Sequence, residues 1–124
     1  RMSKKTLGNL ISKLRKEKGL SHRKLADNLK DLDPKNAISY VSIVHIEKGR
    51  FNSSRETLAV LAKALDYNVD ALLAESDQVG DDVAEVIKDK ADIIPDFLRS
   101  AKNLSKSDWD TLSKMVNKMS NKND

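Results

Sequence analysis

Apolar residues recur along this chain in short stripes with helical spacing, and glycine or proline interrupts the stripes before any of them becomes long. The first stripe occupies positions i, i+3, i+4 and i+7 of an amphipathic helix over residues 6–18, with Leu7, Leu10, Ile11 and Leu14. Gly19 follows the last turn and is the expected C-terminal signal. Such short segments predict packed helices. The sequence lacks the alternation of apolar and polar residues that would predict a sheet.

A second helix is expected after Ser21, whose hydroxyl oxygen can accept a hydrogen bond from a backbone N–H of the first turn. We expect Leu32 to extend the buried face of this helix, which begins with Leu25, Ala26 and Leu29. Pro34 disfavours helix at the residue before it, so residues 33–36 are expected to form a turn.

Three further helices follow the turn. The third is expected after Ser39, the fourth covers residues 55–65, and the fifth follows Asn68. Their expected inward-facing residues are, in chain order, Ile43 and Ile46, then Leu58, Leu61, Ala62 and Leu65, then Val69, Leu72 and Leu73. Together the five helices predict one compact all-α domain over residues 6–74.

The remainder of the chain begins with an acidic stretch. Residues 75–92 hold seven acidic residues and two lysines, and they are expected to form a partly helical connector. Pro95 then starts a helix in its first turn, and Ser105 caps a last helix. Residues 93–120 are therefore expected to form a helical segment, whose apolar residues are Phe97, Leu98, Ala101, Trp109, Leu112, Met115, Val116 and Met119.

Charge is distributed unevenly between the two parts of the chain. Residues 1–74 carry 15 Lys and Arg against 8 Asp and Glu, a net charge of +7. Residues 75–124 carry 8 against 11, a net charge of −3. Only the N-terminal part therefore suits a polyanion such as nucleic acid. Charge alone does not distinguish this interpretation from basic side chains that simply solvate a helical surface.

Several short pieces of the N-terminal part keep a telling order and spacing: Leu7-Gly8, Leu14-Arg15, Gly19-Leu20-Ser21, Leu25-Ala26, Ile43, Ile46-Glu47-Lys48-Gly49 and Leu58 to Leu65. In this order they resemble the lambda-repressor-like (Cro/cI, XRE) family of helix-turn-helix transcriptional regulators, over about residues 6–74. The resemblance implies a five-helix DNA-binding domain, followed here by a short helical C-terminal extension. It also implies that double-stranded DNA is the partner.

In that family the helix after Ser39 is the recognition helix, whose first turn enters the major groove, where all four base pairs present different groups. The resemblance places four residues at base edges, Tyr40, Val41, Ser42 and His45. It places five near phosphates, His22, Ser39, Arg50, Asn52 and Arg55. Phosphate contacts position the protein, whereas base contacts select the sequence. Arg15 and Glu47 match a pair that ties the first helix to the end of the third.

Two features depart from the family pattern. Between Leu29 and Ala37 the chain carries about seven more residues than the family's short turn, so the second helix is expected to be longer and residues 33–36 to protrude. The recognition helix also lacks the Gln, Asn or Arg that make bidentate base contacts. It offers Val41 for thymine methyl groups and His45 for a base acceptor, so few base-specific contacts are expected.

Other kinds of site have less support in the sequence. Tyr40 and His45 have the alternative of packing against the long loop as half-buried residues. No third ligand accompanies His22 and His45, so no metal site is expected. The chain has no cysteine, no glycine-rich phosphate loop and no base at a telling spacing from a nucleophile, so neither an enzyme nor a cofactor is expected. No apolar stretch is long enough for a membrane, and a cytoplasmic protein is expected.

The C-terminal apolar stripe has two alternative uses. It would either dimerise the protein through Trp109, Leu112, Val116 and Met119, or pack on the chain's own N-terminal domain. Because a palindromic operator requires a two-fold symmetric protein, we favour the homodimer.

The predicted function is a sequence-specific transcriptional regulator, a repressor in preference to an activator, that binds a palindromic operator near a promoter. One alternative is an antitoxin that binds a toxin through its C-terminal helices and represses its own operon. Another is a non-specific DNA-organising protein. The length leaves no room for a self-cleaving C-terminal domain, so release from DNA is expected to depend on a protein partner, a small-molecule effector or changed abundance.

Overall fold

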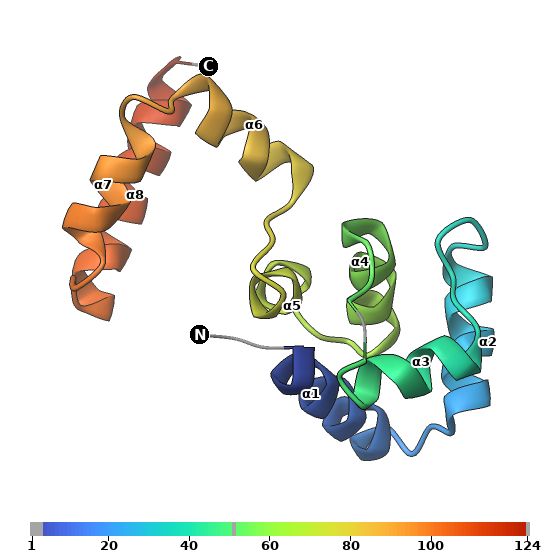
Figure 1. The fold of residues 1–124 in the computed structure, drawn as a ribbon. Helices are drawn as coiled ribbons and strands as arrows, with labels where there is room; N and C mark the ends of the chain where they lie inside the picture. The colour runs from blue at the N-terminus through green and yellow to red at the C-terminus, as the bar shows by residue number, and fades with distance from the viewer. Residues whose placement is uncertain (1–3, 51, 124) are drawn as a thin grey trace. The chain divides into compact units, whose positions relative to one another are not determined.

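The computed structural model describes residues 4–50 and 52–123, which form eight α-helices and no strand (Figure 1). The helices are α1 (Lys4–Glu17), α2 (His22–Leu32), α3 (Tyr40–Glu47), α4 (Arg55–Ala64), α5 (Val69–Glu75), α6 (Asp81–Asp89), α7 (Ile94–Ala101) and α8 (Lys106–Asn123). The all-α prediction is confirmed. The chain separates into two compact units, one ending at Val83 and the other beginning at Ala84.

Short polar side chains start most helices of the first unit, because each supplies an acceptor to a backbone N–H that has no partner within the helix. The acceptors lie 2.8–3.2 Å from the backbone nitrogen three residues ahead, and they belong to Ser21, Ser39, Ser54 and Asn68. Gly19 and Gly49 follow α1 and α3 in the left-handed conformation, with φ of +68° and +71°. These caps confirm the helix starts and stops predicted after α1 and before α2, α3 and α5.

The core lies among α1 to α5, and its buried residues recur at the spacing that the sequence showed. They are Leu7, Ile11, Leu25, Leu29, Ile43, Ile46, Leu58, Val60, Leu61, Ala62, Leu65, Leu72 and Leu73. One prediction about the core is wrong: Leu32 is 55% exposed. It lies in the last turn of α2, beyond Leu29, and the helices that bury Leu25 and Leu29 do not cover it.

The long connection between α2 and α3 is held by specific hydrogen bonds, and its predicted turn at residues 33–36 is confirmed. The Asn36 amide donates to the Asp33 carboxylate at 2.8 Å, and this bond lowers the pKa of Asp33. The Thr57 hydroxyl of α4 donates to the backbone carbonyl of Asn36 at 2.8 Å. Ala37 and Ile38 then pack against the core. The extra residues therefore form a fastened turn that leads directly into α3.

The second unit contains most of α6 together with α7 and α8, and it has little interior. Pro95 lies in the first turn of α7, and the Ser105 hydroxyl accepts from the backbone N–H of Asp108 at 3.1 Å, so both predicted starts are confirmed. Helix α8 continues to Asn123. Among the described residues of this unit, Ala101 is the only buried apolar side chain. None of the helices in the described part of the chain is long and apolar enough to cross a membrane.

Candidate nucleic-acid interface

Helix α3 is fastened to the core on one side and open on the other. Ile43 and Ile46 are buried, whereas Val41 is 46% exposed. Tyr40, Ser42 and His45, the other residues expected to contact bases, are half-buried. An eight-residue helix thus presents its first turn outward, beginning at a serine cap that is itself exposed.

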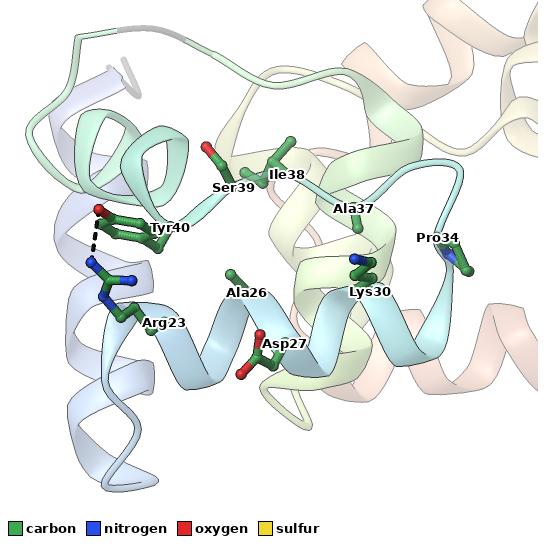
Figure 2. Close-up of a pocket in the computed structure, with 9 residues that line it drawn as sticks. All are labelled: Arg23, Ala26, Asp27, Lys30, Pro34, Ala37, Ile38, Ser39 and Tyr40. Carbon is green, nitrogen blue, oxygen red and sulfur yellow. Dashed lines mark hydrogen bonds between the residues drawn. The ribbon is translucent and has the colours of Figure 1, made fainter.

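Tyr40 is held by Arg23 of α2 (Figure 2). The guanidinium carbon of Arg23 lies 4.0 Å from the centre of the Tyr40 ring, and its Nη2 donates to the phenol oxygen at 3.0 Å. A cation over an aromatic face is attracted by the ring quadrupole, so this pair fixes the ring between α2 and α3. Arg23 was not predicted from the sequence, since no spacing rule connects residues 17 positions apart on different helices.

A groove of about 450 Å³ runs between α2 and the connection to α3 (Figure 2). Its lining residues are Arg23, Ala26, Asp27, Lys30, Pro34, Ala37, Ile38, Ser39 and Tyr40. Tyr40 therefore does border the long loop, as its alternative interpretation proposed, while it remains at the start of α3. Pro34, Ala37 and Ile38 of the long connection contribute to this lining, and no pattern in the sequence predicted the groove.

At the other end of α3, His45 and Arg50 are brought together. Arg50 Nη1 lies 3.2 Å from His45 Nδ1. Because a guanidinium can only donate, Nδ1 is the acceptor and the ring proton is assigned to Nε2. A residue expected to contact a base and one expected to contact a phosphate thus share a hydrogen bond. Asn52 is exposed nearby in the chain.

The predicted pair of Arg15 and Glu47 is confirmed and links α1 to α3. Arg15 donates from Nε to Oε2 at 2.7 Å and from Nη2 to Oε1 at 3.0 Å, and the two side chains are only 9% and 8% exposed. Arg15 Nη1 also donates to the backbone carbonyl of Leu20 at 2.8 Å. The guanidinium is therefore shared between a carboxylate on α3 and the turn between α1 and α2.

His22 joins the same carboxylate. Its Nε2 donates to Glu47 Oε1 at 3.0 Å, since a carboxylate only accepts. Burial would raise the pKa of Glu47, but hydrogen bonds from Arg15 and His22 and their charges lower it overall. The bond to Glu47 likewise raises the pKa of Arg15. His22, expected near a phosphate, is thus also part of the framework that holds the end of α3.

Arg55, also expected near a phosphate, has an acidic partner. Its Nη1 forms an ion pair with the Asp81 carboxylate at the start of α6, and its buried Nε has no hydrogen-bond partner. The guanidinium is therefore engaged by the acidic connector. From the sequence, Asp81 and its neighbour were expected only to contribute charge to the connector, and a pairing with α4 was not predicted.

The residues expected to form a dimer interface lie in the second unit. Trp109, Leu112 and Val116 of α8 line a groove of about 250 Å³ together with Phe97 of α7. Met119 is 58% exposed. Three of the four predicted residues therefore share one groove, and all four occupy the same helix.

Comparison with known proteins gives the same assignment for the N-terminal part. A family model described as Helix-turn-helix matches residues 11–72. The chain is also 33% identical over 104 residues to the immunity repressor protein of Bacillus phage phi105. The aligned region covers 83% of this chain and 67% of that protein. Members of this family bind DNA and are not enzymes, which agrees with the prediction from the sequence. The chain therefore belongs to the Cro/cI-like (XRE) family of helix-turn-helix DNA-binding proteins.

Proposed function

We propose that this protein is a transcriptional repressor that binds a palindromic operator as a homodimer. The observation that carries the proposal is the placement of α3, whose Ile43 and Ile46 are buried while Val41 points outward from a serine-capped first turn. A helix held in this way can insert its first turn into the major groove. Similarity to a phage immunity repressor favours repression over activation.

The proposed contacts divide into two kinds. Tyr40, Val41, Ser42 and His45 would meet base edges, with Val41 against a thymine methyl group and His45 donating from Nε2 to a base acceptor. The proposed phosphate contacts are His22, Ser39, Arg50, Asn52 and Arg55. To contact a phosphate, Arg55 would leave its ion pair with the Asp81 carboxylate. Such contacts release counterions, so affinity should fall as salt increases.

The proposed homodimer uses α8. Each copy offers one recognition helix, and a two-fold axis would present two of them to the same face of the duplex. The proposed contacts are Trp109, Val116 and Met119, which are exposed in one copy, and Leu112, which is half-buried. The proposed place of action is the cytoplasm, where bacterial and phage operators are found.

Selection of bound sites from random DNA duplexes by the full chain tests this function. We expect inverted repeats whose half-site centres lie about 10 base pairs, or a multiple of that, apart. Enrichment of no sequence at physiological salt would instead indicate a DNA-organising protein. Enriched sites without two-fold symmetry would contradict dimeric operator recognition, even if the DNA-binding assignment stands.

A further inference from the structure

The unit that begins at Ala84 leaves its large apolar side chains uncovered. Seven of those in α7 and α8 and the adjoining turn are 36–58% exposed: Phe97, Leu98, Leu104, Trp109, Met115, Val116 and Met119. Exposed apolar patches of this kind usually mark an interaction surface. If each side chain exposes on the order of 100 Å², together they approach the roughly 800 Å² that one partner contributes to a standard interface.

The stripe on α8 has a symmetric spacing. Successive stripe residues are three, four and three positions apart: Trp109, Leu112, Val116 and Met119. This spacing is the same when it is read from either end of the helix, and its centre is residue 114. Spacings of three and four keep these residues on one helix face. Two copies of α8 that run in opposite directions would therefore place Trp109 opposite Met119 of the second copy, and Leu112 opposite its Val116.

The charges of α8 favour the same direction. The exposed acids Asp108 and Asp110 lie in its first half with the exposed base Lys106, Lys114 lies at its centre, and the exposed base Lys118 lies in its second half. An antiparallel pair centred near residue 114 brings Asp110 of one helix beside Lys118 of the other, so that opposite charges lie within the distance at which salt does not screen them. A parallel pair would instead place like charges together. The opposed helix dipoles also favour the antiparallel pair.

We infer that α8 pairs with α8 of a second copy in an antiparallel arrangement, with the two-fold axis near residue 114. The groove lined by Phe97, Trp109, Leu112 and Val116 receives apolar side chains of the second copy's α8. Helix α7 borders this groove through Phe97, so the assembled interface is a bundle of two α7 and two α8 helices. This inference rests on the proposed homodimer and adds the direction and centre of its interface.

Two single-cysteine variants of the full chain test the arrangement, since the chain has no cysteine of its own. Ser113 and Ser120 each directly follow a stripe residue, and both are exposed, so they occupy matching places beside the stripe. In the antiparallel pair, equivalent positions are about 3 Å apart along the axis for Ser113 and about 18 Å for Ser120. We expect Ser113→Cys to yield about tenfold more covalent dimer than Ser120→Cys on oxidation or with a short thiol cross-linker.

The outcomes separate this inference from the proposed function. Equal cross-linking of the two variants would indicate a parallel pair, and cross-linking of neither in a chain that sediments as a dimer would indicate another face. Either result overturns the antiparallel α8 pair and leaves the operator-binding dimer standing. A full chain that sediments as a monomer at tens of micromolar overturns both. Adding Trp109→Asp to Ser113→Cys should abolish the cross-link while the helical circular dichroism is retained.

Discussion

The hydrogen bond between Arg50 and His45 couples two residues with different proposed tasks. Arg50 donates to Nδ1 of the His45 ring, so the ring proton is assigned to Nε2, the atom that would donate to a base acceptor in the proposed contact. Loss of Arg50 would release that constraint as well as a positive charge. A residue proposed to contact a phosphate would therefore influence which base is preferred.

His45→Ala should reduce the binding free-energy difference between the preferred base pair and its substitutes at one position by about 1–3 kcal/mol. Arg50→Ala should weaken binding to all sequences and should also reduce the preference at that position. Because the two side chains touch, the double variant should lose less than the sum of the single losses, by about 0.5–3 kcal/mol. Competition binding with base-substituted operators measures both effects. Val41→Ala is the matched control. When it is combined with Arg50→Ala, the loss of binding free energy should equal the sum of the two single losses. A uniform loss from His45→Ala would contradict its base contact.

Glu47 should make the stability of the first unit depend on pH. Its pKa is lower in the folded protein than its ordinary value of 4.5, so its stabilisation is present above that value and is lost as the pH falls through the folded pKa. Glu47→Gln removes the negative charge and should lower the free energy of unfolding by about 1–3 kcal/mol near neutral pH. Urea unfolding should show this cost shrinking as the pH falls below 4.5.

The control for Glu47→Gln is Glu56→Gln, because Glu56 is exposed in the first turn of α4. Its substitution should change the free energy of unfolding by no more than about 0.5 kcal/mol. A cost for Glu47→Gln that stays constant from neutral to acid pH would contradict the ion-pair explanation.

Helices α1 and α3 approach each other closely at a glycine. An ideal Cβ on Gly8 would lie 2.3 Å from the backbone carbonyl oxygen of Ile46 and 2.6 Å from that of Glu47. Neither atom can move without moving α3. The small residue therefore sets how near the recognition helix lies to α1, and the Arg15–Glu47 pair holds it there.

Gly8→Ala should destabilise the first unit by about 1–3 kcal/mol, because the added methyl group forces α1 and α3 apart. It should also weaken operator binding in the fraction that remains folded, since α3 changes its angle. Thermal unfolding and operator titration measure the two effects. Asn9→Ala is the control on the same helix: Asn9 is exposed, and alanine is the better helix former. Wild-type stability for Gly8→Ala would refute the close approach.

The two units of the molecule differ in how much apolar surface they bury. Every residue of the core cluster lies between Leu7 and Leu73, so the first unit has a complete interior without the C-terminal helices. The second unit has almost none, and it supplies the exposed apolar stripe. Folding and DNA contact therefore belong to the first unit, and the proposed pairing of copies belongs to the second.

Truncation after Ala74 should leave a folded monomer with a wild-type helical spectrum for the retained helices. This fragment should bind a full operator much more weakly than the whole chain, because joining two copies supplies the effective concentration that separate monomers lack. Sedimentation and operator titration of both proteins check the expectation. A fragment that remains dimeric, or that keeps full-site affinity, would show that the interface lies in the first unit.

Local patterns in the sequence were sufficient for the helices and the core. Periodicity, serine caps and glycine stops depend on residues three or four positions apart, so they predicted α1 to α5, the starts of α7 and α8, and the buried apolar residues of the core except Val60. Leu32 was predicted to be buried but is exposed, because burial depends on whether a neighbouring helix is present to cover a periodic residue. Spacing alone does not show where that neighbour ends.

The contacts between distant residues emerged only once the helices were packed. Arg23 meets Tyr40 and Arg55 meets Asp81 across 17 and 26 residues, and no local rule selects either partner. The groove beside α2 and the shared bond of His45 and Arg50 likewise depend on how the connection to α3 and the segment after it turn in space. Helix formation is governed by neighbours along the chain, whereas the side chains that surround α3 are chosen by the packing of helices.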